Sequence, residues 1–280
     1  MRNNAKRQLG KTAKSVVLAI YLLFTIFPFV WMLLTSFKGS QSEIYAFPVT
    51  YLPQNPSLKN YISILVKGSF GRYMINSAIV SAFAAGDGEI IGIMAAYVLS
   101  RFRFRGKKLI MIFFLATQMI PAFVMLGPLR QIIFRLGLID DLRGLILLYT
   151  NMTIPFTVVT LCGFYDTVPK SLEEAAWIDG GGYLKGLRHI VIPVIKPGIV
   201  ATLIFAFVNS WNELYLAVMF LNSSDNKTIP VGLNSLILSF DIKWGEMAAG
   251  TVLALIPTII LFAIAQKYMV EGLTAGAVKE

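Results

Sequence analysis

One short stretch of this sequence carries the side chains best suited to hold a polar solute. Amide, carboxylate and aromatic residues gather there inside a long apolar run, at Asn209, Trp211, Asn212, Glu213 and Tyr215. Amides and carboxylates bind polar groups of a solute, and aromatic rings give apolar faces on which a ring of the solute can stack. Polar groups in such a run normally face a bundle interior or a wet cavity. We therefore expect a path for a polar solute here, with hydrogen bonds that join helices as the competing interpretation.

Other apolar runs hold further polar residues. Asn151 and Gln118 are additional candidates for the same path. Asp87 and Glu89 interrupt another run, where we expect packing beside a wet cavity or beside a basic group of a partner. Small residues recur every four positions in that run and predict a ridge for close helix packing. They are Ala84, Gly88, Gly92 and Ala96.

Catalytic and metal-binding chemistry has little support. The sequence contains one histidine, His189, and one cysteine, Cys162. A nucleophile, a base and an orienting group do not assemble from such a set, and a cysteine or histidine metal cluster is excluded. We therefore predict a protein that is not an enzyme, with no catalytic residues and no metal site.

The composition indicates that the polar residues are held by helices in a membrane. Of the 280 residues, 56% are apolar and only 14% are charged, and the mean hydropathy is +0.68. Soluble domains carry about a quarter charged residues, so much of this surface must face lipid. We predict an all-α, polytopic membrane protein.

Six segments are long and apolar enough to cross a membrane as helices. We place the spans at residues 15–37, 73–100, 109–129, 144–165, 197–221 and 247–268. They lie in a transmembrane domain of residues 15–270, between a basic tail at 1–14 and a second tail at 271–280. Most of the 25 Lys and Arg residues then fall on one side, which is cytoplasmic by the positive-inside rule and holds both termini. The basic stretch Arg101–Lys108 is interpreted as an anchor at anionic headgroups, and not as a nucleic-acid site.

The cytoplasmic loop at residues 169–197 is too long for a plain connector. Ser171 and Glu174 have capping-box spacing, so a short helix is predicted to begin there and to end at Gly180–Gly182. A second short helix is expected from about Tyr183 to His189. With the small residues Ala175 and Ala176 exposed, the pair would form a surface on which another protein can dock.

The spacing of this loop resembles that of a known family. Glu174, Ala175 and Ala176, then Asp179 and Gly180, then Ile190 and Pro193 are similar to the EAA loop of binding-protein-dependent ABC importer permeases. Two positions depart from the family pattern, Gly181 for alanine and Ile192 for leucine. Residues 209–213, 228–233 and 272–279 are similar to permeases of the carbohydrate-uptake (maltose and oligosaccharide) class.

The resemblance implies a set of partners. A second homologous permease, two cytoplasmic ATPase subunits and an extracytoplasmic sugar-binding protein are expected, in the cytoplasmic (inner) membrane of a prokaryote. ATP and Mg would be bound by the ATPases, since this chain lacks a phosphate-binding loop and needs no cofactor. The residues that the resemblance assigns to ATPase coupling are Glu174, Ala175, Ala176, Asp179, Gly180, Gly181, Ile190 and Pro193.

The resemblance implies that the chain is the permease subunit of an ATP-driven importer that moves a sugar or oligosaccharide by alternating access. One alternative is the same architecture with a non-sugar solute. A more distant alternative is a proton-coupled secondary transporter in which Asp87, Glu89 and Glu213 relay protons, because acids inside a membrane are functional candidates.

Overall fold

The computed structural model describes residues 2–178, 181–237 and 242–277. Within these ranges every regular element is a helix, which confirms the predicted fold class. Five of the described helices are long and apolar enough to cross a membrane, and a sixth span results if one bent helix pair is counted as a unit. The chain divides into two compact units, residues 1–70 with 235–255 and residues 71–234 with 256–280.

The first unit contains the long helix α1 (Arg2–Ser36) and the short elements α2 (Gln41–Ile44), α3 (Lys59–Ile62) and η1 (Ser63–Lys67). Helix α13 (Trp244–Ala277) begins in this unit. The Asn60 amide holds the segment after α1, because its Nδ2 donates to the carbonyls of Ser36 and Lys38 at 2.9 and 2.8 Å. The Ser63 hydroxyl donates to Glu246 at 2.9 Å, so η1 is joined to the start of α13.

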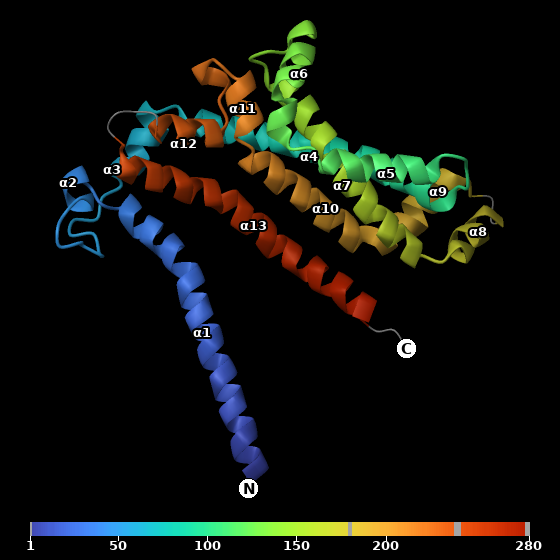
Figure 1. Cartoon of the computed structure of the whole chain (residues 1–280), viewed down its shortest axis with the longest axis horizontal. Helices are drawn as coiled ribbons and strands as arrows, with labels where there is room; N and C mark the ends of the chain where they lie inside the picture. Colours follow the sequence, from blue (N-terminus) through green and yellow to red (C-terminus); the bar gives the residue numbers. More distant parts are fainter. Residues whose placement is uncertain (1, 179–180, 238–241, 278–280) are drawn as a thin grey trace. The chain divides into compact units, whose positions relative to one another are not determined.

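The second unit is a bundle in which α4, α5, α7 and α10 lie side by side (Figure 1). The bounds of its larger helices are α4 (Phe70–Arg101), α5 (Lys107–Gln118), α6 (Ala122–Arg135), α7 (Leu142–Thr167) and α10 (Ile192–Asn212). Its shorter elements are α8 (Lys170–Ile178), α9 (Tyr183–Gly186), η2 (Leu187–Val191), α11 (Tyr215–Phe220), η3 (Ser224–Asn226) and α12 (Ile229–Ile237).

The predicted small-residue ridge brings α4 close to α7. A Cβ atom added at Gly92 would overlap the methyl group of Thr157, and one added at Gly88 would overlap the hydroxyl of Thr153. Ala84 and Ala96, on the same ridge, are fully buried. Backbones that approach this closely gain packing contacts, which drive helix association where lipid removes the hydrophobic effect.

Two predicted spans contain breaks. The segment predicted at 109–129 is divided into α5 and α6, with an angle of 105° between them. Pro121, in extended conformation just before α6, has no N–H to donate and disfavours helical geometry in the residue before it. The segment predicted at 197–221 ends as a helix at Asn212, and α11 follows after Glu213 and Leu214.

The start of α10 also differs from expectation. The second loop helix, predicted from about Tyr183 to His189, is not a separate element. Residues 183–212 form one helical run of 30 residues, in which α9 passes through the wider π-helical turn η2 into α10.

A loop contact holds the end of the bundle at which α7 begins. The Asp140 carboxylate, in the loop before α7, accepts hydrogen bonds from the N–H groups of Asn222 and Ser223 at 2.8 and 3.0 Å. Burial raises the pKa of Asp140, but these bonds and those from the side chains of Ser223 and Asn226 outweigh it and hold the pKa below its ordinary value. The start of α7 and the end of α11 are thereby held together.

Candidate functional site

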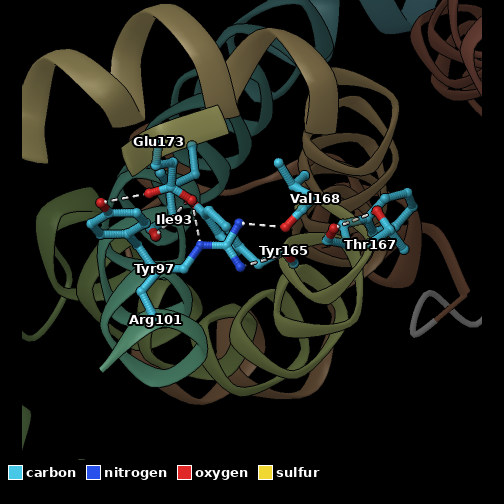
Figure 2. A network of polar contacts seen from close by, with 8 residues as sticks. Ile93, Tyr97, Arg101, Tyr165, Thr167, Val168 and Glu173 are labelled. Atoms are coloured by element: carbon cyan, nitrogen blue, oxygen red, sulfur yellow. Dashed lines mark hydrogen bonds and ion pairs between the residues drawn. The ribbon is translucent and has the colours of Figure 1, made fainter. Parts of the chain in front are cut away.

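Helix α8 is attached to the bundle by a buried acid, Glu173. The Tyr97 hydroxyl donates to Glu173 Oε2 at 2.9 Å, and Arg101 Nε donates to Glu173 Oε1 (Figure 2). Both partners come from the last turns of α4, whereas Glu173 lies in the first turn of α8. The side chains of Arg101 and Glu173 are only 7% and 1% exposed. This contact is therefore a buried ion pair with an additional neutral donor.

Arg101 also binds the end of α7. Its Nη1 donates to the carbonyl of Tyr165 at 2.9 Å and its Nη2 to that of Val168 at 3.0 Å. Carbonyls in the last turn of a helix lack partners within the helix, and a planar guanidinium can satisfy several acceptors at once. One side chain of α4 therefore joins α7 and α8, as Figure 2 shows.

Aromatic rings extend this junction to α9. The ring of Tyr97 lies 5.8 Å from that of Tyr165, and the Tyr165 hydroxyl donates to the carbonyl of Ile93 at 3.1 Å. Trp177 of α8 and Tyr183 of α9 meet edge to face at 4.6 Å between ring centroids. We call the set formed by Tyr97, Arg101, Tyr165 and Glu173 the α8 anchor.

The predicted coupling residues that the structure describes are exposed or half-buried around this junction. Glu174 and Ala175 are exposed on α8, Gly181 is half-buried after it, Ile190 is half-buried in η2, and Pro193 is exposed in the first turn of α10. Asp179, Gly180 and the side chain of Ala176 lie outside the described residues. Three exposed apolar residues adjoin them, Leu172, Ile178 and Leu184, and the sequence reasoning did not single out the last two.

Two expectations about this region are wrong. The capping box is not formed, because α8 begins at Lys170 and Ser171 is already inside the helix, where it cannot act as the cap. Arg101 is not an anchor at the headgroups, since its guanidinium is buried against Glu173 and the carbonyls of α7, whereas Arg103 and Arg105 are exposed. Glu173 itself had no signal beyond its place in the first helical turn.

A cavity of about 490 Å³ lies between α5, α6, α7 and α10, far along the bundle from α8. It brings together four of the predicted pathway residues, Gln118, Asn151, Asn209 and Glu213. The Ser210 and Thr153 side chains add hydroxyl groups. The cavity thus combines amides and hydroxyls with an apolar wall, the chemistry expected for binding a small polar molecule.

The acid in this cavity, Glu213, is already hydrogen-bonded within the chain. The Glu213 carboxylate accepts from the Tyr149 hydroxyl at 2.6 Å and from the N–H groups of Leu216 and Ala217 at 3.0 to 3.2 Å. Free N–H groups in the first turn of a helix attract a carboxylate, so Glu213 stabilises the start of α11. The helix therefore breaks after Asn212 because Glu213 caps the start of α11.

The other predicted pathway residues lie elsewhere. Trp211 is buried and stacks on Phe207, while Asn212 and Tyr215 are exposed and do not line the cavity. Its aromatic wall comes instead from phenylalanines, including Phe156 and Phe205, whose rings stack at 3.8 Å. Phenylalanine is so common in these spans that no sequence pattern distinguishes these two. In the described parts of the chain, no group of three or more His, Cys, Asp and Glu residues could hold a metal ion.

Comparison with known proteins adds a family and a set of relatives. Residues 88–274 match the family model described as "Binding-protein-dependent transport system inner membrane component". The chain is 37% identical to the inner membrane ABC transporter permease protein YcjP of Escherichia coli over 98% of both sequences. It is 34% identical to the diacetylchitobiose uptake system permease protein DasC of Streptomyces coelicolor, over 98% of this chain and 99% of the relative.

A third relative is the trehalose/maltose transport system permease protein MalG of Thermococcus litoralis, 32% identical over 100% of this chain and 99% of the relative. Among solved structures, a bacterial ABC transporter involved in the import of the acidic polysaccharide alginate has a chain similar in fold. The TM-score is 0.82 at 22% identity, over 94% of this chain and 97% of that chain.

Proposed function

We propose that this chain, which belongs to the family of binding-protein-dependent transport system inner membrane components, is one of two permease subunits in an ATP-driven importer. Together the two permeases would carry a sugar or oligosaccharide across the membrane. The chain is an ABC transporter permease, a multi-pass transport component of the inner membrane and not an enzyme. The proposal for the solute is supported by relatives named for diacetylchitobiose and trehalose/maltose, which align with nearly the whole chain.

The proposed importer contains four kinds of subunit. A second homologous permease completes the pathway, two cytoplasmic ATPase subunits bind ATP and Mg, and an extracytoplasmic binding protein delivers the solute. Both termini lie in the cytoplasm, an orientation that the distribution of Lys and Arg supports. The loop that contains α8 and α9 then faces the ATPases.

The proposed docking surface for the ATPases consists of Leu172, Glu174, Ala175, Ile178 and Leu184. Apolar side chains exposed beside small ones offer a contact that the chain does not bury by itself. The α8 anchor lies directly beneath this surface. Because Arg101 joins α8 to α4 and α7, displacement of α8 by an ATPase would move the ends of both helices. The resemblance adds Ala176, Asp179, Gly180, Gly181, Ile190 and Pro193 to the coupling region.

The docking surface is tested by replacing Ile178, which is 86% exposed, with aspartate. The permease is expected to fold, since Ile178 contributes little to its core, but to lose the ATPase on co-purification and to lose ATP-driven uptake. The measurement is mass spectrometry of the tagged complex, followed by uptake of labelled oligosaccharides into proteoliposomes. Leu52→Asp, at an exposed residue of the loop before α3, is the control and should retain the ATPase. An Ile178→Asp importer that keeps its ATPase, or uptake driven by a proton gradient without ATP, would contradict the proposal.

The cavity is the proposed part of the solute path in this subunit. Glu213 is engaged with Tyr149 and α11, so the amides and hydroxyls around it are the groups left to bind a sugar. One of these groups is the exposed Asn209, which lines the cavity from α10.

Replacement of Asn209 by leucine is expected to lower the rate of uptake by up to about tenfold, the effect of losing one hydrogen bond to the solute. Asn212→Leu is a matched control, because Asn212 lies on the same helix outside the cavity and its amide also donates to the carbonyl four residues earlier. Uptake is measured in proteoliposomes at saturating ATP. Equal rates for the two variants would exclude the cavity as the path.

A further inference from the structure

Helix α4 carries two acids near its middle. Asp87 lies 14 residues before Arg101 and 15 residues after Arg72, so about 21 and 23 Å of helix separate it from these two basic residues. The two arginines are thus about 44 Å apart along the helix, more than the thickness of the hydrocarbon core, about 30 Å, which fits between them. Asp87 is therefore close to the centre of the span.

The two acids have different surroundings. Glu89 is buried, and its Oε1 accepts a hydrogen bond from the Thr202 hydroxyl of α10 at 2.9 Å. Asp87 lies on the opposite side of α4, where it is exposed, and none of the described residues forms a hydrogen bond or ion pair with it. A charged carboxylate at this depth is costly in lipid and normally faces protein or water.

Asp87 lines an open groove of about 420 Å³ between α4 and α7. Most of the groove wall is aliphatic, formed by Ile90, Ile91, Ile146 and Leu147. The only cation in this wall, among the described residues, is Arg143. Its guanidinium is engaged by Asp141, with contacts of 3.0 Å from Nε and 2.6 Å from Nη2 to Oδ2. The groove therefore supplies no free counter-charge to Asp87.

We propose that this groove is the seat of a transmembrane helix of the second permease subunit, which presents a lysine, an arginine or another hydrogen-bond donor to Asp87. The aliphatic wall fits the apolar side of such a helix, and Asp87 fixes its depth and rotation, because an acid in lipid is satisfied only where a donor lies opposite. The inference rests on the proposed function, since it requires a heterodimeric importer. It adds the surface by which this subunit holds its partner.

The experiment uses the complete importer, with the tagged chain co-expressed with the second permease, the ATPase and the binding protein. A photo-crosslinking amino acid replaces Ile91 in the groove wall, and the adduct is identified by mass spectrometry. The expected result is a crosslink to the second permease. Labelling of lipid alone, of a second copy of this chain, or of the ATPase would overturn the inference.

Two substitutions make the test independent of the probe. Asp87→Leu is expected to reduce the second permease recovered with the tagged chain by on the order of tenfold, because the donor opposite loses its partner. Glu89→Gln is the matched control, since it keeps a hydrogen bond to Thr202 and should leave recovery unchanged. Equal recovery with Asp87→Leu and wild type would also overturn the inference. If no second permease accompanies even the wild type and no ATP-driven uptake occurs, the proposed function itself fails.

Discussion

Replacing Glu173 by alanine is expected to destabilise the permease by about 3–5 kcal/mol and to abolish ATP-driven uptake. The substitution removes the acid of a buried ion pair and leaves the Arg101 guanidinium in the core without its counter-charge, which is the costly way to break such a pair. The hydroxyl of Tyr97 also loses its acceptor. Thermal unfolding of the purified chain and uptake by the reconstituted importer measure the two effects.

The neighbouring acid is the control for the loss of stability. Glu174 is exposed on the same helix, so Glu174→Ala should change the stability of the chain by no more than about 0.5 kcal/mol. The double variant Arg101→Met with Glu173→Leu removes both charges and should recover much of the lost stability, since apolar replacement of both partners is often neutral. It should not restore full uptake, because the links from Arg101 to α7 are also lost. A Glu173→Ala chain as stable as wild type would refute the α8 anchor.

Replacing Gly92 by alanine is expected to destabilise the bundle by roughly 1–3 kcal/mol, the usual effect of overpacking a core. The added methyl group would overlap Thr157, and α4 would have to move away from α7. Gly86→Ala is a matched control on the same helix, because a Cβ at Gly86 meets nothing within 4 Å and alanine is the better helix former. Relative to wild type, the free energy of unfolding should therefore fall with Gly92→Ala and stay the same or rise with Gly86→Ala.

A second-site substitution tests the cause. Thr157→Gly removes the side chain that the new methyl group would meet, so the Gly92→Ala, Thr157→Gly double variant should be more stable than the sum of the two single changes predicts. Strict additivity would mean that the two helices do not meet at this point.

The five long apolar helices could be predicted because a membrane constrains such segments strongly. A span must satisfy its own backbone hydrogen bonds, so a long run without charge is nearly always a helix. The same rule does not locate breaks. Glu213 ends α10 because its carboxylate finds the N–H groups of the next helix and the hydroxyl of Tyr149, which is 64 residues away in the sequence.

The functional site was predictable only in part, for a similar reason. The spacing of Glu174, Ala175 and Ala176 selected the loop that we propose as the docking surface, and the family match covers that loop. Which of two adjacent glutamates faces inward depends on where α8 begins, and the predicted capping box, with Ser171 as the cap, placed its start two residues too late. Arg101 looked like one more basic residue in a cytoplasmic stretch, because its acceptors on α7 and α8 are 64 or more residues away.

The uninterrupted helix from residue 183 to residue 212 has a mechanical consequence. Its 30 residues span about 45 Å, so one end lies in the docking loop and the other beside Asn209 in the cavity. If the run moves as one body, a tilt of about 5° about the end in the proposed docking loop would move the end beside the cavity by about 4 Å. Under the proposed function, movement of the ATPases and opening of the solute path would then be coupled through this one helical run.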